Sequence, residues 1–167
     1  MVEAAVRSIE PIAQERVKEC LVEAHAFRRR LALLSKTNWI TIVAPALLSA
    51  LAGAAIFEAS ETSVLGAQWK VWSGGAALLS ALLVAVHKGR NCDFYQAECR
   101  RLVQEFEGLA TRYRTLLQLE VAEPRQRLEE LELRLAMVRE TAAIDYPASY
   151  RADAEKSVDA ALQAAAA

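Results

Sequence analysis

The sequence lacks the residue patterns on which enzymes and metal sites are built. It has no phosphate loop of the G-x-x-x-x-G-K-[ST] type, no H-E-x-x-H helix and no G-x-S-x-G turn. Histidine occurs only as His25 and His87, and the cysteines, Cys20, Cys92 and Cys99, include no closely spaced pair. Zinc sites normally need such a pair. We therefore expect no enzymatic activity, no metal and no other cofactor, and we expect Cys20 and Cys99 to pack as small apolar residues.

Aromatic residues are also scarce, at 7% of a chain that is 54% apolar. Alanine dominates the apolar share, so a dense soluble core of large side chains does not account for it. The apolar excess instead lies in two blocks that contain no charged side chain. These are residues 37–57, TNWITIVAPALLSALAGAAIF, and residues 71–86, VWSGGAALLSALLVAV.

The first block is long enough to cross a bilayer as a helix. At about 1.5 Å per residue it matches the roughly 30 Å of the hydrocarbon layer. The second block reaches that length if Lys70 lies at the interface, and Trp39, Trp69 and Trp72 stand at the membrane-boundary positions that indole rings favour. We predict transmembrane helices at 37–57 and 71–87. The alternative, two helices buried in a soluble bundle, would usually show a charged stripe.

Basic residues flank both predicted spans on the same side. Arg28 to Arg30 and Lys36 precede the first span, and Lys88 and Arg90 follow the second. The connection at 58–70 carries Glu58 and Glu61 but no basic residue before its last position. Because cytoplasmic loops are enriched in Lys and Arg, this pattern predicts that both termini are cytoplasmic and that the loop at 58–70 is external.

The remaining segments, 1–36, 88–120, 124–145 and the tail 147–167, have helical patterns. Apolar residues after the second span alternate in steps of four and three, which is typical of a coiled-coil-like seam. We call this the cytoplasmic seam; it consists of Tyr95, Cys99, Leu102, Phe106, Leu109, Tyr113 and Leu116. Pro124 suits the first turn of a new helix. We expect one all-α membrane domain, with a two-helix transmembrane hairpin and a cytoplasmic three-helix bundle. The second span would continue directly into the helix at 88–120, and the tail would form a short helix or fray.

Small and weakly polar residues form a stripe along each predicted span. They are Asn38, Thr41, Pro45, Ser49 and Gly53 in the first span and Ser73, Ala77 and Ser80 in the second. Small residues let helices approach closely in a membrane. The stripes could therefore pack against neighbouring copies in a homo-oligomer and line a pathway, or they could only fasten the hairpin to itself.

The order of these features resembles a known bacterial family. Residues 27–57, FRRRLALLSKTNWITIVAPALLSALAGAAIF, followed by the second span and by residues 87–118, HKGRNCDFYQAECRRLVQEFEGLATRYRTLLQ, are similar to the SLATT domain. SLATT domains are two-transmembrane effectors associated with SMODS and SLOG proteins in bacterial conflict systems. The resemblance implies an inner-membrane protein that forms or gates a pore in antiviral defence. It supplies no catalytic residue.

That resemblance also implies partners. Besides the lipid bilayer and further copies of the chain, a cytoplasmic sensor protein or a nucleotide second messenger would supply the activating signal, and nothing indicates nucleic-acid binding. The alternative from another class is a membrane-anchored scaffold that conducts nothing and docks a cytoplasmic partner through its helical bundle. Neither the seam nor the charged helices identify such a partner.

Overall fold

The computed structural model is helical in nearly all of the residues that it describes. These are residues 2–58, 66–89, 91–118 and 123–166, with side chains described for 9–54, 71–89, 91–118 and 123–165. In these segments five helices occur and no strand: α1 Val2–Glu58, α2 Gly66–Gly89, α3 Cys92–Gln118, α4 Pro124–Glu140 and α5 Ala148–Ala166. The predicted all-α class is confirmed. Most of the predicted loop at 58–70 lies outside the described residues.

The chain divides into two compact units. One consists of residues 1–32 and 96–167 and is called the bundle unit here; the other consists of residues 33–95 and is called the hairpin unit. Helix α1 contributes its first part to the bundle unit and its second part to the hairpin unit. Both uncharged blocks of the sequence fall within the hairpin unit.

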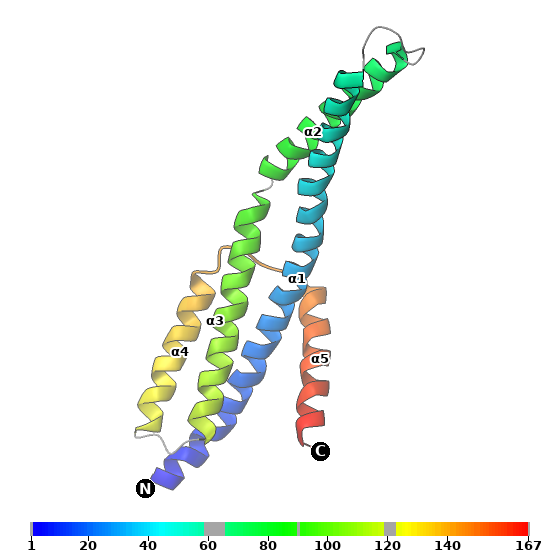
Figure 1. Ribbon diagram of the computed structural model, residues 1–167. Coiled ribbons are helices and arrows are strands. Elements are labelled where there is room, and N and C mark those ends of the chain that lie inside the picture. The colour runs from blue at the N-terminus through cyan, green and yellow to red at the C-terminus, as the bar shows by residue number, and fades with distance from the viewer. Residues whose placement is uncertain (1, 59–65, 90, 119–122, 167) are drawn as a thin grey trace. The chain divides into compact units, whose positions relative to one another are not determined.

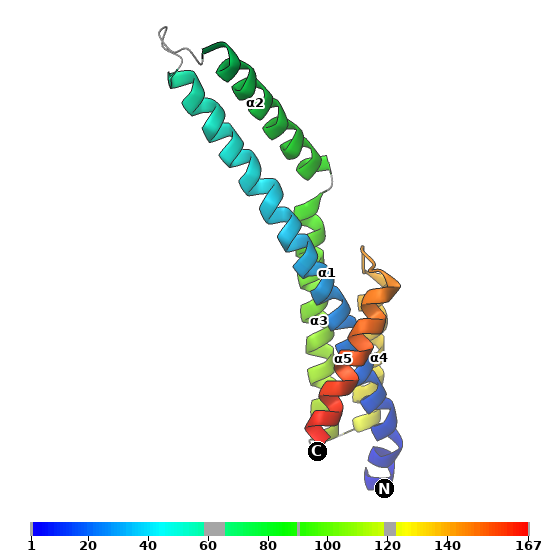
Figure 2. The same ribbon diagram turned by 90° about the vertical axis from the view of Figure 1, so that its right-hand side faces the viewer.

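The hairpin unit pairs the second part of α1 with α2 in antiparallel fashion (Figure 2). Thr41 contacts His87 and Ser49 contacts Ser80, so residue numbers rise along one helix as they fall along the other. Two helical stretches, Ile9–Ala54 and Val71–Gly89, are long and apolar enough to cross a membrane. The prediction of two such helices is confirmed.

The bundle unit packs α3, α4 and α5 against the first part of α1 (Figure 1). Phe27 of α1 stacks on Phe106 of α3 at 6.0 Å between ring centroids and meets the edge of Tyr146 at 4.8 Å. Leu135 and Val138 of α4 are also buried. Aromatic pairs of this kind add to the stabilisation from burial alone. The core therefore lies among α1, α3 and α4, near the segment that leads into α5.

The tail, for which the sequence predicts a short helix or a frayed end, is helical. Ala154 and Val158 of α5 are buried in a small apolar cluster with Val22 and Ala26 of α1. The ammonium of Lys18 lies 2.6 Å from a carboxylate oxygen of Asp159, at the edge of this contact. The bundle unit therefore contains a fourth helix beyond the three that were predicted.

The predicted continuation of the second span into the next helix is wrong. Helix α2 ends at Gly89 and α3 begins at Cys92, and Asn91 between them has a φ of 47°. Asparagine adopts this left-handed conformation more readily than most residues, and such a residue next to a helix end terminates the helix. The backbone N–H of Asn91 donates to the Lys88 carbonyl, and the carbonyl of Asn91 accepts from Tyr95, so α3 starts anew.

The third predicted cytoplasmic helix starts as expected but ends earlier. Pro124 is its first residue, preceded by Glu123 in a left-handed conformation. The helix ends at Glu140, not at 145, and the segment from Thr141 to Pro147 is irregular. Ile144 in this segment is buried, which anchors the connection to α5.

Candidate functional site

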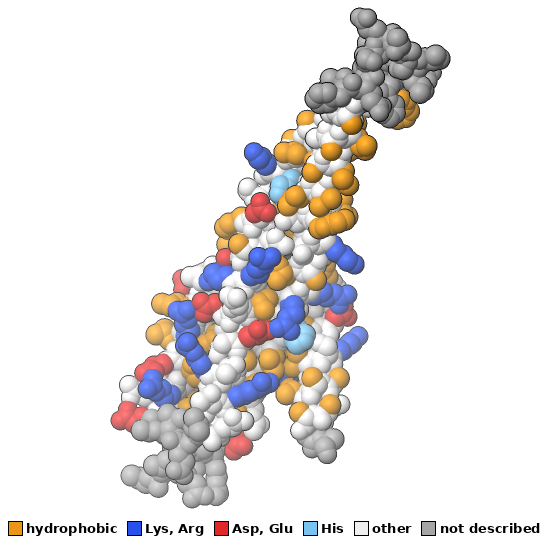
Figure 3. All heavy atoms as spheres, viewed as in Figure 1, with side chains coloured by type: hydrophobic (Ala, Val, Ile, Leu, Met, Phe, Trp, Pro, Cys, Tyr) orange, Lys and Arg blue, Asp and Glu red, His pale blue; other side chains and the backbone are white. Residues whose placement is uncertain are grey.

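The outer surface of the hairpin unit is apolar. Figure 3 shows hydrophobic side chains gathered over this unit, whereas acidic and basic side chains cover the bundle unit. Among the described residues of the two uncharged blocks, the large apolar residues with at least 40% exposure are Trp39, Ile40, Ile42, Leu47, Leu51, Val71, Trp72, Leu78, Leu79, Leu82, Val84 and Val86. In the most hydrophobic segment of each helical stretch, only a small share of the residues is buried: 11% in Ile9–Ala54 and 6% in Val71–Gly89. Core helices of a soluble protein are mostly buried, so these helices are not core helices of this chain.

Polar side chains of the hairpin lie between its two helices. Ser80 is 5% exposed, and its hydroxyl donates to the carbonyl of Pro45 at 3.0 Å. The Oγ atoms of Ser49 and Ser80 are 2.8 Å apart. Since Ser80 has one proton and gives it to Pro45, the Ser49 hydroxyl is the donor in that second contact. The hairpin thus buries the Ser80 hydroxyl between its helices and exposes leucines such as Leu78, which is the reverse of a soluble helix pair.

A second cluster of polar side chains joins α1, the end of α2 and the start of α3 within the hairpin unit. Thr41 Oγ1 lies 3.0 Å from His87 Nδ1, and His87 Nε2 lies 3.5 Å from a carboxylate oxygen of Asp93. Asn38 Nδ2 donates to the other Asp93 oxygen at 3.3 Å. These four side chains link α1, α2 and α3 at the point where the uncharged blocks end. His87 therefore has a packing role in the hairpin unit.

The structure brings part of the predicted stripe together and separates the rest. Asn38, Pro45 and Ser80 are buried, and Thr41 and Ser49 reach α2 through the contacts just described. Gly53 and Ser73 are partly buried, whereas Ala77 is exposed. Thr41, Pro45, Ser49 and Ser80 of the stripe therefore join the two helices of one hairpin.

A further small-residue face of α2 escaped the sequence reasoning. Gly74, Ala77, Ala81 and Ala85 recur at three- and four-residue spacing and are all exposed. The spacing of Ala77, Ala81 and Ala85 was visible in the sequence. The sequence did not show that this face is exposed, because Ser80 and His87 contact α1 only when the two helices pack.

The cytoplasmic seam lies on the buried face of α3 except at its first member. Tyr95 belongs to the hairpin unit and is 37% exposed. The other members, Cys99, Leu102, Phe106, Leu109, Tyr113 and Leu116, are all buried in the bundle unit. The helix restarts at Cys92, and Tyr95 lies in its first turn, next to Phe94. The seam therefore serves packing within the bundle unit from Cys99 onward.

A polar network joins three helices of the bundle unit and runs from the buried Tyr113 to the exposed Arg139. The Tyr113 hydroxyl donates to Glu132 Oε1 at 3.0 Å, and Arg16 Nε donates to both Glu132 oxygens at 2.9 and 3.1 Å. Arg16 also binds Glu19, and Glu19 pairs with Arg139. This network links α1, α3 and α4 through charged hydrogen bonds, which are stronger than neutral ones.

The network shifts the ionisation of its members. Burial raises the pKa of Tyr113 well above its usual range, and the hydrogen bond to Glu132 acts in the same direction. Burial alone would raise the pKa of Glu19, but the bonds and charges of Arg16 and Arg139 outweigh burial and lower it. Burial also raises the pKa of the neighbouring Cys20 thiol to about 12. Tyr113 and Cys20 are therefore neutral at physiological pH, and Glu19 is charged.

Comparisons with known proteins give no relative for these units: no family model matches the chain, and no curated protein or solved structure is detectably similar to it. Within the described side chains, no group of three His, Cys, Asp or Glu residues is arranged to hold a metal ion.

Proposed function

We propose that the protein is a two-pass membrane protein whose hairpin unit crosses the bilayer. The observation that carries this proposal is the reversed polarity of the hairpin, with its leucine and tryptophan side chains exposed and Ser80 buried. Soluble monomers rarely expose large contiguous apolar patches. Lipid covers such a surface without exposing apolar groups to water, while the buried Ser80 hydroxyl keeps its hydrogen bonds within the hairpin.

The proposed topology places both termini in the cytoplasm of a bacterial cell and the segment 59–65 outside. Helix α1 has 57 residues, more than twice the roughly 20 that a membrane span needs, so only its uncharged part lies in the bilayer. Lys36 and Lys88, both exposed, stand at the cytoplasmic boundary of the two helices.

Accessibility of engineered cysteines tests this topology. A membrane-impermeant maleimide should label Thr62→Cys in intact spheroplasts and should label Ala160→Cys only after the membrane is opened. Background should be low because Cys20, Cys92 and Cys99 are all buried. Labelling of Ala160→Cys in sealed spheroplasts would reject the orientation, and recovery of the protein in the soluble fraction would reject insertion.

We further propose that the protein is an oligomeric effector that forms or gates a pore in the inner membrane, with a role in antiviral defence as the SLATT resemblance implies. The exposed face of Gly74, Ala77, Ala81 and Ala85 supports contact between copies, since small residues allow helix backbones to approach closely in lipid. A conducting pathway would then form among copies and not within one hairpin.

The alternative is a membrane-anchored scaffold that conducts nothing. It is favoured by the engagement of Ser49 and Ser80 with each other, because this leaves fewer hydroxyls to line a pathway. Liposomes loaded with potassium or a small dye separate the two functions, provided that the mass of the inserted protein is measured in parallel. Leakage from a defined oligomer supports the effector. Tight liposomes, together with an unchanged membrane potential in cells that overproduce the protein, support the scaffold.

A further inference from the structure

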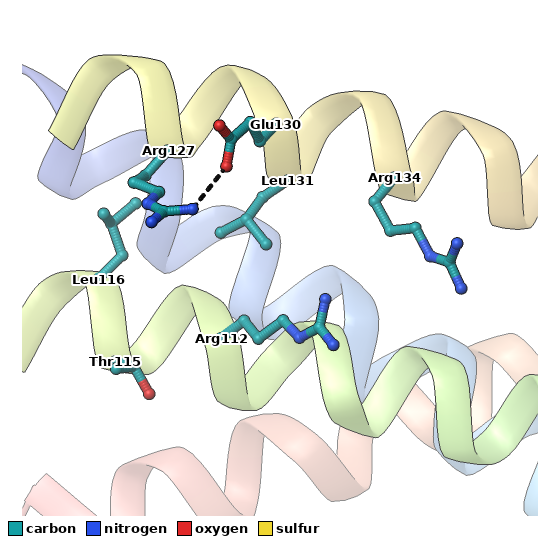
Figure 4. Close-up of a pocket in the computed structure, with 7 residues that line it drawn as sticks. All are labelled: Arg112, Thr115, Leu116, Arg127, Glu130, Leu131 and Arg134. Atoms are coloured by element: carbon teal, nitrogen blue, oxygen red, sulfur yellow. Dashed lines mark hydrogen bonds and ion pairs between the residues drawn. The ribbon is translucent and has the colours of Figure 1, made fainter. Parts of the chain in front are cut away.

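The ion pairs that the structure describes in the bundle unit join side chains that keep their charge near neutral pH. In the groove between α3 and α4, for example, Arg127 pairs with Glu130 at 2.9 Å (Figure 4). Arginine and glutamate side chains ordinarily stay ionised between pH 5 and 8, whereas histidine ordinarily changes its charge in that range. The hairpin unit contains a contact of this second kind, between His87 and Asp93.

His87 lies where the two helices of the hairpin unit meet the start of α3. Its side chain is 14% exposed, and both ring nitrogens face oxygen atoms. Nδ1 is 3.0 Å from the hydroxyl of Thr41, and Nε2 is 3.5 Å from a carboxylate oxygen of Asp93. Asp93 is the only acidic residue among the described side chains of the hairpin unit. The one acid and the one histidine of this part of the chain therefore lie together.

The hydroxyl of Thr41 decides which protons this cluster needs. Besides His87, the Thr41 Oγ1 atom lies 3.1 Å from the backbone carbonyl oxygens of Thr37 and Asn38. Carbonyl oxygens only accept hydrogen bonds, and a hydroxyl has a single proton to give. When Thr41 donates to either carbonyl, its oxygen can only accept from His87. Nδ1 of His87 must then carry a proton.

A neutral histidine does not satisfy all of these contacts at once. Neutral imidazole has one N–H group, so a proton on Nδ1 leaves a lone pair on Nε2 that faces the negative Asp93 carboxylate. The other neutral form, with its proton on Nε2, requires the Thr41 hydroxyl to turn away from both carbonyls. The doubly protonated ring donates to Thr41 and presents a second N–H to Asp93. All contacts of the cluster are therefore made together only when His87 is charged.

The other charged or titratable groups around His87 are compatible with a positive ring. Helix α2 ends two residues later, at Gly89, and the carbonyl groups at a helix C-terminus favour a positive side chain. Lys88 and Cys92 line the same hollow of about 340 Å³; Cys92 is buried, and Lys88 is exposed, so water screens its repulsion. In the hairpin part of α1, the only charged residue with a described side chain is Lys36, which is exposed.

We propose that His87 is a pH-sensitive latch that joins the three helices of the hairpin unit. The protonated ring connects the end of α2 to α1 through Thr41 and to α3 through Asp93, whose other oxygen accepts from Asn38 of α1 at 3.3 Å. Loss of the proton sets a lone pair against the carboxylate or breaks the Thr41 contact, so the junction of α2 and α3 loosens. Since the proposed topology places this junction at the cytoplasmic boundary, the latch responds to cytoplasmic pH; only this last step rests on the proposed function.

Hydrogen exchange at the junction tests the latch in the full-length protein in nanodiscs, without any assay of conduction. The backbone amides of Asn91 and Tyr95 report on it, because they bond to the carbonyls of Lys88 and Asn91. After correction for the intrinsic effect of pH on exchange, we expect their protection to be at least threefold higher at pH 5.5 than at pH 8. The effect is modest because the Asp93 carboxylate is exposed and screened by water.

Two variants remove the two sides of the latch. His87→Gln removes the titrating ring and should abolish the difference between the two pH values. Asp93→Asn keeps the ring but removes its charged partner, and it should reduce the difference clearly. The matched control is His25→Gln, because His25 is the only other histidine and belongs to the bundle unit. It should keep the full difference.

Three results would overturn the proposal. The first is a wild-type protein whose corrected protection at the junction differs less than threefold between pH 5.5 and pH 8. The second is a full difference in His87→Gln, which would place the titrating group elsewhere. The third is a full difference in Asp93→Asn, which decides the matter if His87→Gln fails to fold. Failure of membrane insertion is recognised separately, because the protein is then recovered in the soluble fraction.

Discussion

Replacement of Ser80 by leucine tests whether the polar contacts inside the hairpin hold its two helices together. Hydrogen bonds between membrane helices contribute about 0.6 kcal/mol on average and up to about 1.7 kcal/mol. Ser80 takes part in two, with Ser49 and with Pro45, so its removal in Ser80→Ala should cost about 1.2 kcal/mol. Leucine adds overpacking of about 1 to 3 kcal/mol at this 5% exposed position.

The total for Ser80→Leu is therefore about 2 to 4 kcal/mol, at least a tenfold shift in the equilibrium between closed and open hairpin. Ala81→Leu is the matched control, because Ala81 is the next residue of α2 and is exposed. It should leave the closed hairpin unchanged. If the exposed small-residue face joins copies, Ala81→Leu should reduce the mass of the oligomer. Ser80→Leu should instead lower the stability of the closed hairpin.

Tryptophan fluorescence during titration with SDS measures the hairpin selectively, because Trp39, Trp69 and Trp72 are the only tryptophans and all belong to the hairpin unit. The midpoint for Ser80→Leu should fall clearly below that for wild type, while Ala81→Leu should match wild type. Equal midpoints for the two leucine variants would refute the assignment of Ser80 to the helix contact. A fall for Ala81→Leu alone would place the contact on the opposite face of α2.

Further predictions concern the bundle unit. Tyr113→Phe removes a hydrogen bond to a charged carboxylate and should lower the free energy of unfolding by about 1.5 to 3 kcal/mol in denaturant titrations. Since burial raises the pKa of Tyr113 in the folded state, its contribution is complete below the unfolded pKa of about 10 and is lost as pH rises further, so alkaline unfolding should be shallower in Tyr113→Phe. The Cys20 thiol, with its pKa raised to about 12, should resist alkylation by iodoacetamide at pH 8 until the protein unfolds, as mass spectrometry would show. Val158→Asp, which buries a charge against α1, should release α5 to limited proteolysis, whereas the exposed change Ala160→Asp should not.

The two apolar helices could be predicted because their signal is local. A run such as 37–57 has no charge at any position, so its character does not depend on which neighbour it meets. The break between α2 and α3 was different. Gly89 alone was compatible with a continuous helix, and the deciding residue was Asn91, whose left-handed conformation depends on the hydrogen bonds of the two helix ends it joins. A single sequence does not contain those bonds.

The candidate sites show the same limit. Periodicity identifies which residues share a helix face, as it did for Thr41, Ser49 and Ser80, but it does not say which helix the face meets. The ion pair between Glu105 of α3 and Arg134 of α4 was not predicted, because the two residues meet only when the two helices pack against each other. Contact between helices is decided by the whole interface, to which distant residues such as Glu105 and Arg134 contribute.

The two units bury opposite kinds of residue, and this links the fold to the proposed membrane location. The bundle unit buries Phe106 and Leu135 and exposes arginines, an arrangement that is stable in water. The hairpin unit buries Ser80 and exposes Leu78 and Trp72, an arrangement whose apolar surface is stable only when water is excluded from it. Helix α1 contributes to both units, so one continuous helix serves two different surroundings. In water the hairpin unit would expose its apolar side chains, and in lipid the bundle unit would expose its arginines. A boundary between lipid and water near the junction of the units, at residues 32–36, satisfies both arrangements at once.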